Sequence, residues 1–156
     1  MKSLWLKVTP LLICLLLASG CSTPLNLSNV PITITEYTRT ATDTKARLKL
    51  NISNENIFSV AIASITGKLY LNGTYIGKFE ITKPMGIQRL GTSALEAELI
   101  IEKTDIVQKL RASSAPSIAY RLECKLHLEL SEERSNSSTV SEGQIDTASL
   151  RAEPSK

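Results

Sequence analysis

Few residues of this chain belong to the types that support catalysis or bind metals. The 156 residues include three cysteines (Cys14, Cys21 and Cys124) and one histidine, His127. A zinc site usually needs four ligands, so this set predicts neither a metal site nor another cofactor. Cys124 and His127 stand at opposite parity in a segment of alternating hydrophobicity, which places them on opposite faces of a strand. We therefore expect no Cys–His pair, with Cys124 in the core and His127 exposed.

The other polar candidates have simpler explanations than chemistry. Asn54 and Asn56 could bind a ligand, but asparagines that hydrogen-bond their own backbone in a turn are commoner. Gly73, Gly77 and Gly86 are spaced for turns and close strand contacts, not for a phosphate loop. A net charge of +3 without a basic cluster argues against nucleic acid as a partner. The sequence thus predicts a protein that is not an enzyme and has no catalytic residues.

The first twenty residues have the layout of a secretory signal peptide. Lys2 and Lys7 precede the apolar run Leu11–Leu17, and the small residues Ala18-Ser19-Gly20 follow it. The apolar run is too short for a transmembrane helix, which needs about 20 apolar residues. We expect residues 1–20 to direct export and then to be removed.

The junction Leu17-Ala18-Ser19-Gly20-Cys21 resembles the lipobox of bacterial lipoproteins, although Ala18 stands where leucine is commonest. In that class the cysteine is acylated, palmitate being one of the acyl groups, and becomes the first residue of the mature chain. The resemblance implies a membrane anchor at Cys21. The alternative is an ordinary signal peptide with an incidental cysteine. Ser22, rather than aspartate, implies the periplasmic face of the outer membrane more than the inner membrane of a Gram-negative host.

Cleavage before Cys21 changes the composition of the remaining chain. Removal of Lys2 and Lys7 leaves 16 basic and 15 acidic residues, a net charge of +1. Trp5, the single tryptophan, is also lost. With Cys21 acylated, Cys124 is the only free thiol, so an intrachain disulfide is not expected.

Alternation of apolar and polar residues dominates the rest of the chain. It covers residues 30–35, 48–52, 58–71, 75–81, 95–101 and 118–130, with a further short strand at 140–145. The parity of the apolar positions flips near Ala63–Ser64, which predicts a β-bulge. Asn72-Gly73 predicts a type I′ hairpin, and Pro31 predicts an edge strand.

One segment has helical spacing, from a capping Thr104 to about residue 112. Together these segments predict an all-β fold with one short helix. Its architecture would be an antiparallel immunoglobulin/fibronectin-like β-sandwich of six to seven strands, with a closed barrel as the alternative. The expected organisation is a signal peptide at 1–20, an acylated tether at 21–29, a β-sandwich domain at 30–147 and a flexible tail at 148–156.

The segment Leu48–Phe58 resembles the signature of the late embryogenesis abundant group 2 family, also called the water stress and hypersensitive response (WHy) domain. Asn54, Asn56 and Phe58 match the family's Asn-Pro-Asn motif and its following apolar residue, while Glu55 replaces the proline. Gly77 in Ile76-Gly77 and Tyr120 in Tyr120-Arg121-Leu122 match later positions of the pattern.

This resemblance implies a non-enzymatic role in desiccation or osmotic stress, or in protein interaction. With the lipobox, it predicts a lipid-anchored envelope protein whose partner is the membrane, through Cys21, with a protein as a possible second partner. A periplasmic binding module for an apolar ligand such as a lipid remains the alternative function.

Overall fold

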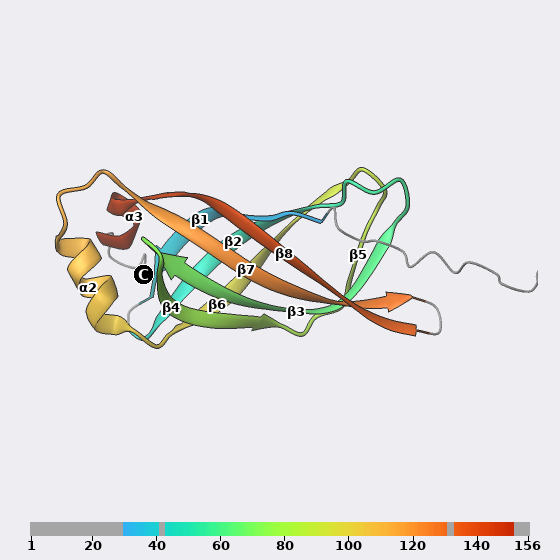
Figure 1. The fold of residues 1–156 in the computed structure, drawn as a ribbon, viewed down its shortest axis with the longest axis horizontal. Coiled ribbons are helices and arrows are strands. Elements are labelled where there is room, and N and C mark those ends of the chain that lie inside the picture. The colour runs from blue at the N-terminus through green and yellow to red at the C-terminus, as the bar shows by residue number, and fades with distance from the viewer. Residues whose placement is uncertain (1–29, 41–42, 131–132, 152–156) are drawn as a thin grey trace, which may run out of the picture.

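Alternating apolar and polar residues form a long, strongly coiled antiparallel sheet with two short helices at one end (Figure 1). The computed structural model describes residues 30–40, 43–130 and 133–151. The elements are β1 (Ile32–Arg39), β2 (Lys45–Ser53), β3 (Val60–Leu71), β4 (Thr74–Ile81), β5 (Met85–Ile87), β6 (Thr92–Ile101), α2 (Thr104–Ala112), β7 (Ser117–Leu130), β8 (Glu133–Asp146) and α3 (Thr147–Arg151).

The strands form one sheet that nearly closes into a barrel. Its order is β1-β2-β6-β4-β3-β7-β8, with β5 paired to β3 beside that path. The two end strands meet without forming a ladder, and the Ser141 hydroxyl donates a hydrogen bond to the Ile32 carbonyl. The immunoglobulin-like sandwich is therefore not confirmed, since its two separate sheets are joined here through β4 and β6. The mostly antiparallel β architecture is confirmed.

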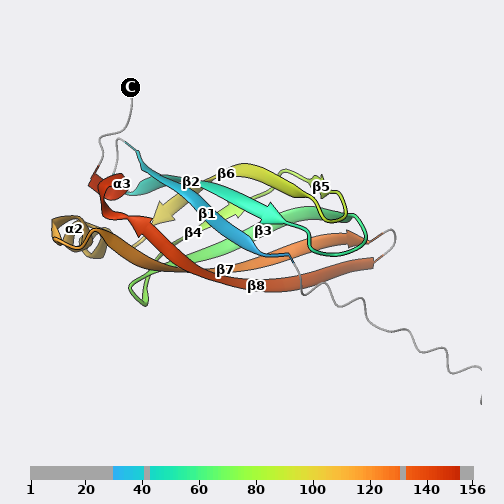
Figure 2. The same ribbon diagram turned by 90° about the horizontal axis from the view of Figure 1, so that it is seen from above.

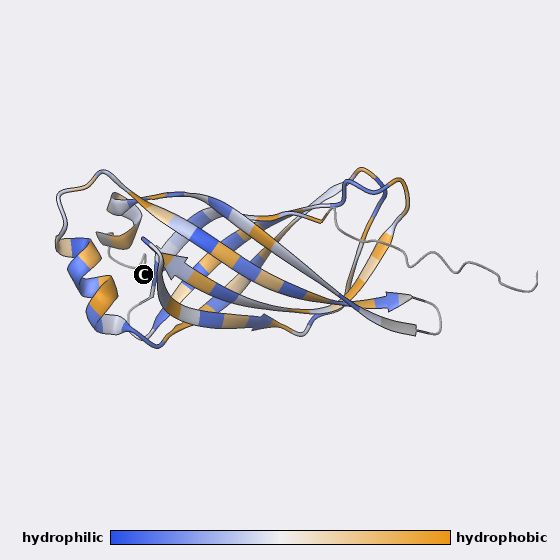
Figure 3. Ribbon diagram, in the orientation of Figure 1, coloured by the Kyte–Doolittle hydropathy of each residue, from blue (hydrophilic) through white to orange (hydrophobic). Residues whose placement is uncertain are grey.

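The core lies inside this barrel and follows the alternation of the strands. In Figure 3 hydrophobic and hydrophilic residues alternate along β7 and β3. The longest inward row belongs to β7, in which Ile118, Tyr120, Leu122, Cys124, Leu126 and Leu128 are all buried. Inward residues of the other strands join them in one contiguous cluster, so the described interior is filled by side chains.

Several local predictions are confirmed. The register between β3 and β7 shifts between Ile62 and Ser64, which is the predicted bulge. Asn72 and Gly73 have φ values of 47° and 76°, and they connect β3 to β4 as a tight hairpin. β1, the strand that follows Pro31, lies at an end of the sheet.

Other segments differ from their prediction. β8 spans fourteen residues and pairs with β7 along its whole length, although the sequence predicts only a short strand at 140–145 there. The segment Lys83-Pro84-Met85-Gly86 has the composition of a turn, but Met85 and Gly86 belong to β5 and pair with β3. Thr104 is not the cap of α2, because Lys103 holds that position and no side chain caps the helix. α3 occupies residues 147–151 with Leu150 buried, where a tail was expected from residue 148.

The barrel has two distinct ends, and the views in Figures 1 and 2 agree on their composition. α2 and α3 lie at one end, here called the helical end. The chain enters the barrel at the other end, at Val30, beside the loops 54–59 and 88–91. We call this the entry end.

Candidate functional site

Cys124 and His127, the residues closest to a catalytic pair, do not form one. Cys124 is buried in the inward row of β7, where burial raises the pKa of its thiol to about 12. The thiol is therefore protonated at neutral pH and a poor nucleophile. His127 is half-buried on the outer face of the same strand. Among the described residues, no group of three His, Cys, Asp or Glu side chains could hold a metal ion.

Asn54 is the most highly connected polar residue of the entry end. Its side chain is 1% exposed, and its Nδ2 donates hydrogen bonds to three carbonyls, those of Phe58 (2.8 Å), Ile87 (3.2 Å) and Gln88 (3.0 Å). Its Oδ1 accepts from the backbone N–H and the side-chain amide of Asn56, at 3.0 and 2.9 Å. One buried amide thus satisfies backbone groups from two segments that are far apart in the sequence.

The backbone completes the connection between these two segments. The Asn54 N–H donates to the Gly91 carbonyl at 2.8 Å, and the Leu90 N–H donates to the Asn56 carbonyl at 3.1 Å. Asn54, Asn56 and Phe58 are therefore brought together as a clamp between loops 54–59 and 88–91. Phe58 takes part through its carbonyl, and its half-buried ring packs against the core. The three residues serve to position these loops.

Gly77 and Tyr120 lie apart from this clamp and have structural roles of their own. A Cβ atom at Gly77 would lie 2.0 Å from the Ile100 carbonyl oxygen, so glycine permits the close approach of β4 and β6. The Tyr120 ring covers Gly143 on β8, and its hydroxyl accepts a hydrogen bond from the Ile34 N–H at 3.3 Å. Ile34 borders the bulge in β1, so Tyr120 connects β7 to the opposite end of the sheet.

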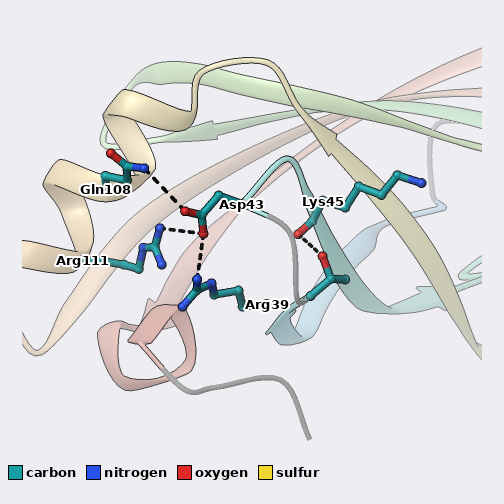
Figure 4. A network of polar contacts seen from close by, with 6 residues as sticks. Arg39, Asp43, Lys45, Gln108 and Arg111 are labelled. Atoms are coloured by element: carbon teal, nitrogen blue, oxygen red, sulfur yellow. Dashed lines mark hydrogen bonds and ion pairs between the residues drawn. The ribbon is translucent and has the colours of Figure 1, made fainter. Parts of the chain in front are cut away.

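A polar network at the helical end connects α2 to the turn between β1 and β2 (Figure 4). Asp43 accepts from Arg39 at 2.9 Å and from Arg111 of α2 at 3.0 Å, with Gln108 at 3.5 Å. Burial would raise the pKa of Asp43, but the hydrogen bond and charge of Arg111 and the charge of Arg39 hold it below its ordinary value. No sequence pattern indicates this network, because Gln108 and Arg111 are 65 and 68 residues away from Asp43 in the chain.

A groove of about 510 Å³ crosses the outer face of β4, β3, β7 and β8. The register places Lys78, Lys68 and Glu123 in one row along it, and Glu80, Thr66 and Lys125 in the next. The charges are of both signs, with Lys68 and Lys78 side by side. Gly67, Phe79 and the buried Cys124, whose thiol is protonated, lie between the two rows. Most of the groove's surface is apolar, and the exposed side chains Ile100 and Val140 stand at the two ends of the first row. The described residues that line it form no catalytic arrangement.

Cys21, the predicted lipidation site, lies outside the described residues, as does the signal peptide. Neither α2 nor α3, the helices of the described ranges, is long and apolar enough to cross a membrane.

The fold therefore defines the class of this protein: a mostly β domain whose loops at one end are connected by an asparagine clamp. The chain belongs to the late embryogenesis abundant protein (LEA_2) family, whose profile matches residues 49–132. That range begins in β2, includes the clamp and extends through β7. A search of curated proteins finds no match.

The solved structures that resemble this fold include two with TM-scores above 0.5. The solution structure of AT1g01470 from Arabidopsis thaliana has a TM-score of 0.57 at 19% identity, over 84% of this chain and 89% of that one. A protein described as late embryogenesis abundant, At2g46140.1, has a TM-score of 0.53 at 17% identity, over 90% of this chain and 84% of that one. At these identities the likeness concerns the fold alone.

Proposed function

We propose that this protein is a non-enzymatic lipoprotein of the bacterial cell envelope, anchored through acylated Cys21. It would hold its β domain at the periplasmic face of the outer membrane. There it would protect the membrane or neighbouring proteins during desiccation or osmotic stress, or serve as an interaction module. The observation that carries the stress role is membership of the late embryogenesis abundant family. The anchor is supported by the sequence Leu17–Cys21.

The architecture limits how such a protein can act. Its backbone groups are paired in a sheet and its apolar side chains fill one core, so it does not resemble the disordered, highly charged chains that act by wrapping their partners. Protection or interaction must then operate through the outer surface. The inert thiol of Cys124 and the mixed charges of the groove support a non-enzymatic role.

The alternative, a carrier of an apolar ligand, requires an empty apolar cavity inside the barrel. Buried side chains of the described strands occupy that interior, and the groove on the outer face is bordered by charged residues. The apolar surface of that groove lies on the outside of the barrel and not in an enclosed cavity, so the anchored protective domain is the better-supported proposal.

The experiment is a survival assay in a bacterium that carries this gene. We compare the parent, a deletion strain, the strain complemented with the native chain, and one complemented with Cys21→Ser. The proposal expects the deletion to lower survival after drying or osmotic shock, and the native chain to restore it. It also expects Cys21→Ser to restore less, at equal protein level. Equal survival of parent and deletion strains would contradict the protective role.

A further inference from the structure

Two large apolar side chains project from the entry end of the barrel. Ile57 is 81% exposed and Leu90 is 72% exposed, the highest values among the large hydrophobic residues of the described ranges. The other two exposed residues of this kind, Ile100 and Val140, lie on the sides of the barrel, in β6 and β8. Single exposed apolar residues are ordinary on soluble proteins, but a pair on adjoining loops is less so.

The asparagine clamp fixes the two loops that present these side chains. Ile57 follows Asn56, whose carbonyl accepts the Leu90 N–H at 3.1 Å. Leu90 has a φ of 52°, in the left-handed region that a branched residue rarely adopts. A strained and exposed leucine held by a buried hydrogen-bond network suggests a position that is kept for contact with something outside the domain.

The tether ends at this same end of the barrel. The Ser53 N–H donates to the Pro31 carbonyl at 3.0 Å, so the entry of the chain lies directly beside loop 54–59. Figures 1 and 2 show that the entry of the chain and the two loops share one end, opposite α2 and α3. Nine residue steps separate Cys21 from Val30, and they can span at most about 32 Å. An acyl anchor at Cys21 would therefore keep the entry end close to the bilayer.

We propose that Ile57 and Leu90 dock the barrel on the lipid bilayer that holds its anchor, with both side chains in the interfacial region. This inference rests on the proposed acylation of Cys21. Arg89 is exposed beside Leu90 and suits lipid phosphate, while the exposed Glu55 on the other loop offsets its charge. Apolar contact therefore provides most of the attraction. Docking orients the helical end, with the Asp43 network, away from the membrane.

The test uses tryptophan fluorescence, because the chain has no tryptophan beyond Trp5 of the signal peptide. Three variants, Ile57→Trp, Leu90→Trp and Ser114→Trp, are produced in a Gram-negative host and purified from its membranes in acylated form. Each is reconstituted into phosphatidylethanolamine–phosphatidylglycerol vesicles, with or without brominated acyl chains. Ser114 is exposed in the loop between α2 and β7, so it reports on the helical end. Intact mass reports acylation, and far-UV circular dichroism reports folding.

The proposal expects blue-shifted emission and quenching by brominated lipid at positions 57 and 90, with neither effect at position 114. Acylated, folded variants whose emission is equally unquenched at all three positions would overturn docking and leave the anchor intact. Docking would also be overturned by a blue shift that increases with protein concentration and is not accompanied by quenching. In that case a second copy of the chain would cover the loops. A chain without acyl mass on Cys21 would overturn the proposed anchor and this inference with it.

Discussion

Replacement of Asn54 by alanine removes every side-chain hydrogen bond of the clamp at the entry end. The amide has two N–H donors, shared among the carbonyls of Phe58, Ile87 and Gln88, and one oxygen that accepts two bonds from Asn56. This corresponds to about four hydrogen bonds, each with a net value of about 0.5–1.5 kcal/mol. Because the site is buried, water cannot fully replace the lost partners. We expect Asn54→Ala to lower the free energy of unfolding by about 3 kcal/mol.

The assay is urea unfolding followed by far-UV circular dichroism, on a soluble form that begins at Ser22. With an m-value of about 2 kcal/mol/M, the midpoint should fall by about 1.5 M. Asn136→Ala is the matched control, because Asn136 is exposed on β8 and its loss should change stability by no more than about 0.5 kcal/mol. If the two variants unfolded at the same urea concentration, the clamp would not have the role assigned to it.

Three further predictions concern other parts of the barrel. Gly143→Ala would place a Cβ atom 2.7 Å from the Tyr120 ring and should destabilise the chain by about 1–3 kcal/mol. Gly86→Ala is the control, because the space around its Cβ position is open, and it should not destabilise the chain. Similar unfolding midpoints for the two variants would argue against close packing of the Tyr120 ring on Gly143. The pKa of Asp43 is lower in the folded chain than its ordinary value of 3.8, so its stabilising effect is complete above that pH and is lost as the pH falls through the folded pKa. The stability difference between the native chain and Asp43→Asn should therefore shrink in acid, and a difference independent of pH would count against the network. The Cys124 thiol, with its pKa raised to about 12, should react with Ellman's reagent only after unfolding, and rapid reaction of the folded chain would show that it is accessible.

Strand positions could be predicted from the sequence because period-two alternation records which face of a strand is buried. The long inward row of β7, the bulge near Ser64 and the Asn72-Gly73 hairpin all follow from local patterns. The order of the strands in the sheet does not follow from local patterns. Alternation identifies the inner face of each strand but does not indicate which strands pair with each other. A sandwich and a nearly closed barrel share the same alternation, and the single sheet depends on the brief pairing of β4 with β6 at Gly77 and Lys78.

β8 shows a second limit of local patterns. Its inward positions include Ser137, Thr139 and Ser141 instead of large apolar residues, so no hydrophobic alternation indicates a strand there. Pairing with β7 imposes the strand, since an extended partner with unpaired backbone groups is already in place. The burial of Cys124, by contrast, is confirmed because its neighbours in the alternation are leucines.

The clamp illustrates how far a motif can be interpreted before the fold is known. Asn54 was expected to bond its own turn, and its bonds to Asn56 and Phe58 confirm this. Its bonds to the carbonyls of residues 87 and 88 connect positions more than thirty residues apart. No spacing rule predicts such contacts, so the exposed pair Ile57 and Leu90 could not be recognised as neighbours from the sequence.

The most direct test of the account is the intact mass of the protein extracted from membranes of a Gram-negative host. We predict a chain that begins at Cys21 and carries the mass of its acyl groups, and whose processing is blocked by globomycin, an inhibitor of the lipoprotein signal peptidase. Cys21→Ser should abolish both the added mass and the sensitivity to globomycin. A mature chain with a different first residue, or with an unmodified Cys21, would contradict the anchored envelope protein proposed above.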